Sequence, residues 1–353
     1  MNEKTLEWYL NRARPADEQA AQACRKSWDS VAKPLNSLGL LEAAVCRVAA
    51  AQRRAPKLDR RRLIVACADN GVVAEGVTQT GSEVTRQVAA SIARGGSSVC
   101  AMARVARCEV VCVDAGMNQP LSDARVLDRR AGAGTGNIAL GPAMTREQAR
   151  FTLTTGIELA CQAKDEGCDI LLTGEMGIGN TTTSAALLCR MLDLRPETAV
   201  GRGAGLDDAG LKRKIAVVRR ALDICAAPKG DPVGTLSALG GFDIGCLAGV
   251  FIGGAVCGLP VVIDGLISAA AALVAARVCP PCAAYMLASH VSRESAAAAA
   301  LDALGLRAPI CADMALGEGS GAVALLPLLD MALGVLNTSA HFDAIGVEAY
   351  KPL

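Results

Sequence analysis

Two acidic residues stand in glycine-rich loops, each between an apolar run and a predicted helix. Glu318 lies in Leu316-Gly-Glu-Gly-Ser-Gly321, and Glu175 lies in Gly174-Glu-Met-Gly-Ile-Gly-Asn180. Because glycine has no side chain, a ligand can approach the backbone and the carboxylate closely. Backbone N–H groups at the start of a helix attract anions. The two loops therefore predict a site for an anionic small molecule with a carboxylate available as a base.

Two stretches are candidate phosphate cradles. The loop around Glu175 is no Walker motif, because no Gly-Lys-Ser/Thr follows, but its N–H groups and the polar side chains of Asn180 and Thr181 can hold a phosphate. A tight turn without a ligand is the alternative. The second candidate is Gly201-Arg-Gly-Ala-Gly205 followed by Lys214, which fails as a dinucleotide fingerprint. A solvated helix face is the alternative for the lysines.

Composition narrows the class of protein. The formal net charge of +1 argues against nucleic acid as a main partner, because such binding normally requires a basic field. Apolar residues make up 52% and aromatics 3%, which predicts a core of Ala, Val, Leu and Ile with close helix contacts. The fifteen cysteines lie inside apolar runs, which favours reduced thiols in a cytoplasmic protein. The redox-like spacing of Cys279 and Cys282 is a weaker alternative.

Neither a metal site nor a membrane segment is expected. His290 and His341 are the two histidines, and the cysteine spacing supplies no zinc cluster, so we predict no metal. The N-terminus has no apolar signal region. Ile244–Ile263 is uncharged but interrupted by glycines and Pro260, so we predict a buried helix and then a buried strand rather than a membrane span.

Apolar runs alternate with helical segments from Leu63 onward. Strands are predicted over 63–67, 109–113, 169–172, 260–263 and 283–287, and polar residues follow them at Asp69, Asp114, Glu175, Asp264 and Ser289. Helices are predicted over 82–104 and, with a capping box at Thr145 and Gln148, over 145–164. This alternation indicates an α/β fold with a parallel sheet covered on both faces. In such sheets ligands bind at the carboxyl ends of the strands.

The motifs together resemble one family, the nicotinate-nucleotide:dimethylbenzimidazole phosphoribosyltransferases of cobamide lower-ligand activation. The segments that carry the resemblance are Ala68–Gly76, Glu83–Gln87, Gly134–Asn137, Gly141–Thr145, Gly174–Thr182, Gly201–Gly203 with Lys214, Gly240–Asp243, Asp264–Gly265, Ser289–Ser292 and Leu316–Gly321. The resemblance implies a Rossmann-like domain over residues 61–310. It also implies a small helical domain from residues 1–60 and 311–353, and a homodimer in the cytoplasm.

The resemblance also implies residue roles. Glu318 is the expected catalytic base, and Glu175 is a second carboxylate facing the reacting centre. The expected nucleotide ligands are Gly177, Asn180, Thr181, Gly203, Lys214, Asp264, Ser292, Gly317 and Gly319. The expected base ligands are Thr80, Ser82, Glu83, Gln87, Met176 and Met314. The implied reaction moves ribose 5-phosphate from nicotinate mononucleotide to a benzimidazole-type base, without a cofactor. For Asp264, capping of the next helix is an alternative role.

The chain departs from the usual family pattern at three places. Asn70 stands where the family usually has His, Gln79–Ser82 replaces an aromatic-Pro-Gln run, and Arg293–Ala297 replaces a Glu-Pro-Gly-His segment. Small, polar residues beside the base predict a roomier pocket. Alternative functions are a subunit of a heteromeric relative that activates phenolic bases, or a non-catalytic base-binding partner. An NAD-dependent oxidoreductase is disfavoured, because no dinucleotide fingerprint is present.

Overall fold

A parallel sheet forms the centre of the molecule in the computed structural model, which describes residues 5–350. The six strands lie in the order β3-β2-β1-β4-β5-β6, and each pairs with its neighbours in parallel. Their bounds are β1 (Arg61–Ala68), β2 (Cys108–Gly116), β3 (Val126–Asp128), β4 (Ile170–Met176), β5 (Val261–Ile263) and β6 (Met286–Ala288). All carboxyl ends therefore meet at one edge, which confirms the predicted α/β class.

After its first two residues, Arg61 and Arg62, the central strand β1 is apolar because both faces of the sheet are covered. Leu63, Val65 and Cys67 face one hydrophobic core, whereas Ile64 and Ala66 face the other. Successive side chains of a strand point to opposite faces, so a strand buried on both sides needs an unbroken apolar run. This physical requirement made β1 recognisable from sequence.

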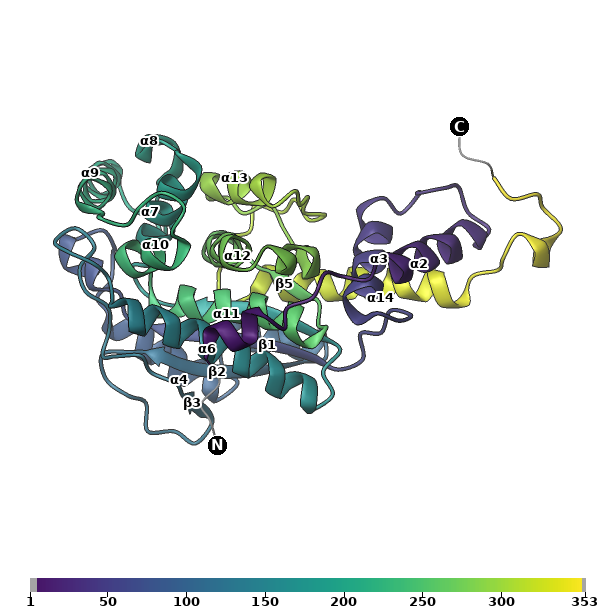
Figure 1. The fold of residues 1–353 in the computed structure, drawn as a ribbon, viewed down its shortest axis with the longest axis horizontal. Helices are drawn as coiled ribbons and strands as arrows, with labels where there is room; N and C mark the ends of the chain where they lie inside the picture. The colour runs from purple at the N-terminus through teal and green to yellow at the C-terminus, as the bar shows by residue number, and fades with distance from the viewer. Residues whose placement is uncertain (1–4, 351–353) are drawn as a thin grey trace.

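Helices cover the two faces of the sheet in different ways. On one face α6 (Arg146–Asp165) and α11 (Phe242–Cys257) lie together, and on the other lie α4 (Glu83–Ala93), α5 (Ser98–Val105) and α14 (Ser320–Thr338). Figure 1 shows an outer helical layer beyond α11. It comprises α7 (Asn180–Leu192), α10 (Pro232–Leu239), α12 (Leu266–Val278) and α13 (Ser295–Ala303), with α8 (Pro196–Ala199) and α9 (Asp208–Ile224) packed on α7.

The contact between α6 and α11 depends on glycine. A Cβ added to Gly156 would lie 1.9 Å from the carbonyl oxygen of Cys246, and one added to Gly249 would lie 2.1 Å from that of Leu153. The two backbones therefore touch, as the small-residue composition leads one to expect. The predicted buried helix and strand of Ile244–Ile263 are confirmed as α11 and β5.

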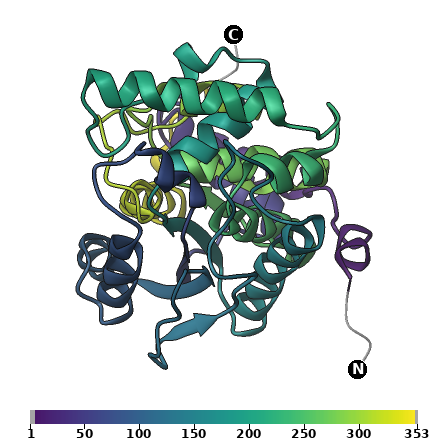
Figure 2. The same ribbon diagram turned by 90° about the vertical axis from the view of Figure 1, so that its left-hand side faces the viewer.

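A helical lobe projects from the sheet-containing body. It is built from α2 (Glu18–Ser30), α3 (Leu40–Gln52) and the far end of α14, while α1 (Leu6–Leu10) lies against α6 and α11 (Figures 1 and 2). The domain boundaries after residues 60 and 310 stay a prediction. By length and composition alone α14 could cross a membrane, but it packs against α3, α5 and β4 as a core helix does.

Three elements differ from the expectations. The edge strand β3 was not expected, since three residues carry too little pattern to detect. The helix predicted over 82–104 is two helices, because Gly95, at φ +75°, ends α4 before α5 begins. The strand predicted over 283–287 is shifted: a 3₁₀ helix, η2, spans Pro280–Tyr285 and β6 follows. The capping box of Thr145 is confirmed. The reduced state of the cysteines stays a prediction.

Candidate active site

A cavity of about 300 Å³ opens at the carboxyl edge of the sheet, between the ends of β4, β5 and β6. It brings together residues from both carboxylate loops and both phosphate candidates. The expected residues on its wall are Glu175, Met176, Gly177, Asn180, Thr181, Gly203, Asp264, Ser292, Gly317 and Glu318. The convergence follows from the parallel topology, because each residue follows a strand or starts a helix at this edge.

Glu318 adopts a left-handed backbone conformation. Its φ is +60°, and the flanking Gly317 and Gly319 have φ values of +82° and +92°. Left-handed geometry strains a residue with a Cβ, so such residues concentrate at functional sites. A Cβ added to Gly174 would lie 2.4 Å from the carbonyl oxygen of Glu318, so the end of β4 touches this loop directly. The glycines thus allow the loop to present the Glu318 side chain to the cavity.

Asp264 fixes the loop that carries Glu318. Its Oδ1 accepts hydrogen bonds from the N–H groups of Gly321 (2.7 Å) and Ala322 (3.1 Å), and its Oδ2 accepts one from Gly319 (3.2 Å). Asp264 therefore caps α14 from β5 rather than the next helix, α12, because the N-terminus of α14 lies beside the end of β5. Burial raises the pKa of Asp264. Its expected contact with the nucleotide stays a prediction.

Glu175 is the more deeply buried of the two glutamates. Asn180 Nδ2 donates to Glu175 Oε2 and also to Asp243 Oδ2 at 2.9 Å. Burial, together with the nearby carboxylates of Asp243, Asp264 and Glu318, raises the pKa of Glu175 to about 8. At neutral pH Glu175 is therefore mainly protonated and cannot accept a proton. Glu318 is half-buried on the wall of the same cavity, and its role as the base stays a prediction.

Asp243 is a buried acid to which the sequence alone had assigned no role. It belongs to the glycine-rich start of α11, and burial raises its pKa to about 6. A Cβ added to Gly177 would lie 2.7 Å from its Oδ2, so the acid supports the wall of the cavity. In the sequence, the signal for Asp243 was the Gly240-Gly-Phe-Asp243 segment, which carries part of the family resemblance.

Asn70, at the departure from the family pattern, donates a hydrogen bond from Nδ2 to the carbonyl oxygen of Ile178 at 3.4 Å.

Lys214 lies directly behind the cavity wall. Its Nζ donates to Thr181 Oγ1 at 2.7 Å, and a Cβ added to Gly203 would lie 3.2 Å from Nζ. The residue is 1% exposed, and burial lowers its pKa to about 8 while Glu294 opposes that shift. The solvated-face alternative is therefore wrong for Lys214, although the neighbouring Lys212 is exposed. Thr181, Gly203 and Lys214 form one polar cluster, which we call the phosphate cradle.

The structure brings part of the expected base-binding set to this cavity, and the base-binding roles stay predictions. Met176 lines the cavity, but Thr80, Ser82, Glu83, Gln87 and Met314 lie outside its lining. On α4 the inward residue is Val88, because one helical step turns a side chain about 100° away from its predecessor, and Gln87 is exposed. The cavity therefore presents an apolar contact where the sequence had indicated polar ones.

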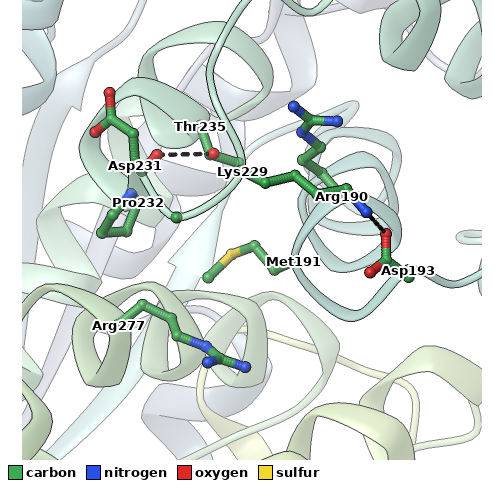
Figure 3. A pocket seen from close by; sticks show the side chains of 9 residues that line it. Arg190, Met191, Asp193, Lys229, Asp231, Pro232, Thr235 and Arg277 are labelled. Carbon is green, nitrogen blue, oxygen red and sulfur yellow. Dashed lines mark hydrogen bonds and ion pairs between the residues drawn. The ribbon is translucent and has the colours of Figure 1, made fainter.

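A second cavity of about 340 Å³ lies away from the sheet edge, between the end of α7, the loop before α10 and the end of α12 (Figure 3). Arg190, Lys229 and Arg277 line it, and Lys229 pairs with Asp193. Neither carboxylate loop reaches it. Cavity volume alone therefore does not identify the active site, whereas convergence of the motifs does.

Comparison with known proteins identifies the family of the chain. A family model described as Phosphoribosyltransferase matches residues 13–347. The nicotinate-nucleotide–dimethylbenzimidazole phosphoribosyltransferase of Ruminiclostridium cellulolyticum is 39% identical over 350 residues, 99% of each chain. That of Chloroflexus aggregans is 41% identical over 344 residues, 97% of this chain and 98% of the relative. The crystal structure of CobT from Thermus thermophilus is 42% identical, with a TM-score of 0.89, covering 94% of this chain and 100% of that chain.

Proposed function

The chain belongs to the phosphoribosyltransferase family of these relatives, and we propose that it moves ribose 5-phosphate from nicotinate mononucleotide to a benzimidazole-type base. The observation that carries the proposal is one cavity that joins the buried, mainly protonated Glu175 and the carboxylate of Glu318 to a phosphate cradle. A carboxylate beside a bound substrate can act as a general base.

The reaction needs a base more than an acid. In nicotinate mononucleotide the ribose C1′ is bonded to a positively charged pyridinium nitrogen. When that bond breaks, the ring leaves as an uncharged pyridine without needing a proton. The incoming imidazole nitrogen forms the new bond to C1′, and the second ring nitrogen gives up its proton. Glu318 takes that proton, while attack from the opposite face inverts C1′ and yields α-ribazole 5′-phosphate.

Positioning is the second contribution of the site. We assign the nucleotide phosphate to the phosphate cradle, where Lys214 supplies charge and Gly203 supplies a backbone N–H. The N-terminus of α7, beginning at Asn180, adds a favourable dipole. The ribose is assigned to the wall between Gly177 and Ser292, and the base to the side formed by Met176 and Val88. Holding both substrates at reacting distance accounts for much of the expected rate.

The remaining features of the proposal rest on the family resemblance. We propose a homodimer located in the cytoplasm that acts in nucleotide-loop assembly of cobamides. The projecting lobe of α2, α3 and α14 is proposed as the small domain, with boundaries near residues 60 and 310. Size-exclusion chromatography with light scattering tests the oligomer, and limited proteolysis tests the boundaries.

The proposed activity is tested by incubating purified protein with nicotinate mononucleotide and a panel of bases. Release of nicotinate that depends on the base, with formation of the α-ribotide, is the expected result. The panel contains dimethylbenzimidazole, benzimidazole, adenine and a phenol. Two fully buried methyl groups would add about 1.6 kcal/mol, which is roughly 15-fold. The small residues of Gln79–Ser82 predict incomplete burial, so we expect a preference for dimethylbenzimidazole over benzimidazole below about tenfold. An exclusive choice of dimethylbenzimidazole contradicts the roomy pocket, and no transfer to any base favours a non-catalytic partner subunit.

A further inference from the structure

The carboxylate of Glu294 extends into the phosphate cradle. Glu294 is the N-cap residue of α13, but its side chain makes no capping bond to that helix. Instead Oε1 accepts a hydrogen bond from the N–H of Gly203 at 3.0 Å. The same N–H is one of the donors expected to hold the nucleotide phosphate. An internal anion therefore occupies a position assigned to the substrate's anion.

The loop before α9 is shaped to admit this carboxylate. A Cβ added to Gly201 would lie 1.7 Å from Glu294 Oε2, so only glycine leaves room for it. Within residues 5–350 that oxygen is buried and has no hydrogen-bond partner. A buried oxygen without a donor is unfavourable. The cradle therefore has room for an oxyanion, but among the described residues it offers Oε2 of Glu294 no hydrogen-bond donor.

The buried charge of Lys214 is a second reason to expect an anion in the phosphate cradle. Lys214 is almost fully buried, and a buried cation requires a nearby counter-charge. Glu294 is the carboxylate whose attraction opposes the fall in the pKa of Lys214. In the structure the counter-charge thus comes from the chain itself. A bound phosphate group would supply it in the loaded enzyme.

We propose that Glu294 is an internal competitor for the phosphate subsite, which must withdraw when a phosphate-bearing ligand binds. The proposal rests on the proposed function for one point, the assignment of the phosphate to this cradle. Because substrate and product both carry the 5′-phosphate, the competition weakens both complexes. Glu294 thereby favours release of the product as well as raising the nucleotide concentration needed for saturation.

The test compares two ligands that differ by the phosphate alone. Calorimetric titrations at pH 7 use nicotinate mononucleotide and nicotinate riboside with the parent protein, Glu294→Gln and Glu294→Ala. The matched control is Asp302→Asn, which removes an exposed carboxylate from the same helix. Removal of a competing charged hydrogen bond predicts dissociation constants about tenfold lower for the mononucleotide in both Glu294 variants. Riboside binding, and all binding to the control, should stay within about twofold of the parent.

Kinetics separate displacement from a merely structural role. The Michaelis constant for nicotinate mononucleotide should fall in the Glu294 variants while kcat does not rise. Unchanged or weaker mononucleotide binding in both cooperatively melting variants would overturn the proposal, as would an equal gain for the riboside or in Asp302→Asn. A parent that binds nicotinate mononucleotide but transfers no ribose phosphate would refute the proposed function and leave this inference standing.

Discussion

Replacing Glu175 by glutamine is expected to stabilise the unliganded protein, and more strongly as the pH rises. Burial raises the pKa of Glu175 from 4.5 to about 8. In the unfolded chain the side chain ionises above its ordinary pKa, whereas the native state keeps the proton until the pH approaches 8. Folding therefore takes up a proton in this window, and native stability falls as the pH increases through it. Glutamine is uncharged in both states and removes the effect.

The size of the stabilisation follows from the two pKa values. Each pH unit between them corresponds to roughly 1.4 kcal/mol for one group. The gain in the free energy of unfolding should be about 1 kcal/mol at pH 5, about 3 kcal/mol at pH 7 and about 4 kcal/mol at pH 8, and it should level off above that. The amide of Asn180 keeps an acceptor, because glutamine retains one oxygen at this position.

Urea unfolding of Glu175→Gln and the parent at several pH values between 5 and 8 measures this gain. Glu18→Gln on α2 is the matched control, because Glu18 is exposed and its replacement should change stability little. A stabilisation of the Glu175 variant that is constant across this range would refute the raised pKa. Loss of stability at every pH would show that the carboxyl group makes contacts that glutamine cannot replace.

Three further substitutions test the rest of the site. Glu318→Gln should lower kcat by roughly two to four orders of magnitude with cooperative melting retained, and turnover within about tenfold of the parent would exclude a general base here. Lys214→Ala should weaken nicotinate mononucleotide binding by about 1.5–3 kcal/mol without affecting the base. In the parent the Michaelis constant for that nucleotide should rise above pH 8, where Lys214 loses its charge. Gly174→Ala places a Cβ 2.4 Å from the carbonyl oxygen of Glu318 and should reduce kcat at least about tenfold. An unchanged kcat would show that the loop moves aside without displacing the Glu318 carboxylate.

The fold was largely predictable because a doubly covered parallel sheet leaves a strong sequence pattern. Strands such as β1 must be apolar on both faces, and an acidic or polar residue stands in or just after the last residues of β1, β2, β4, β5 and β6. The pattern fails where an element is short or is determined by its neighbours. The edge strand β3 has three residues, and β6 begins late because Pro280 and Pro281 favour the preceding 3₁₀ turn.

The site was predictable only in part. Glycines on both sides identify Glu318 and Glu175, since such freedom is rarely needed around an ordinary surface acid. No local pattern reveals Glu294, because its importance depends on Gly201 and Gly203 from a distant loop. Helical phase decides which residue of α4 reaches the cavity, and the structure places Val88 on the lining and the neighbouring Gln87 outside it. The raised pKa of Glu175 depends on burial in three dimensions, which no local pattern shows.

The bonds from Asp264 to the start of α14 also constrain how the chain folds. The helix they hold, α14, packs on β4 in the body and on α3 in the lobe, and both lie far from it in sequence. The loop that carries Glu318 therefore acquires its shape only after these distant segments have come together. Contacts so distant in sequence slow folding and leave apolar surface exposed in the meantime. The apolar face that receives α14 stays exposed until α14 docks, so the active site is completed only at that step.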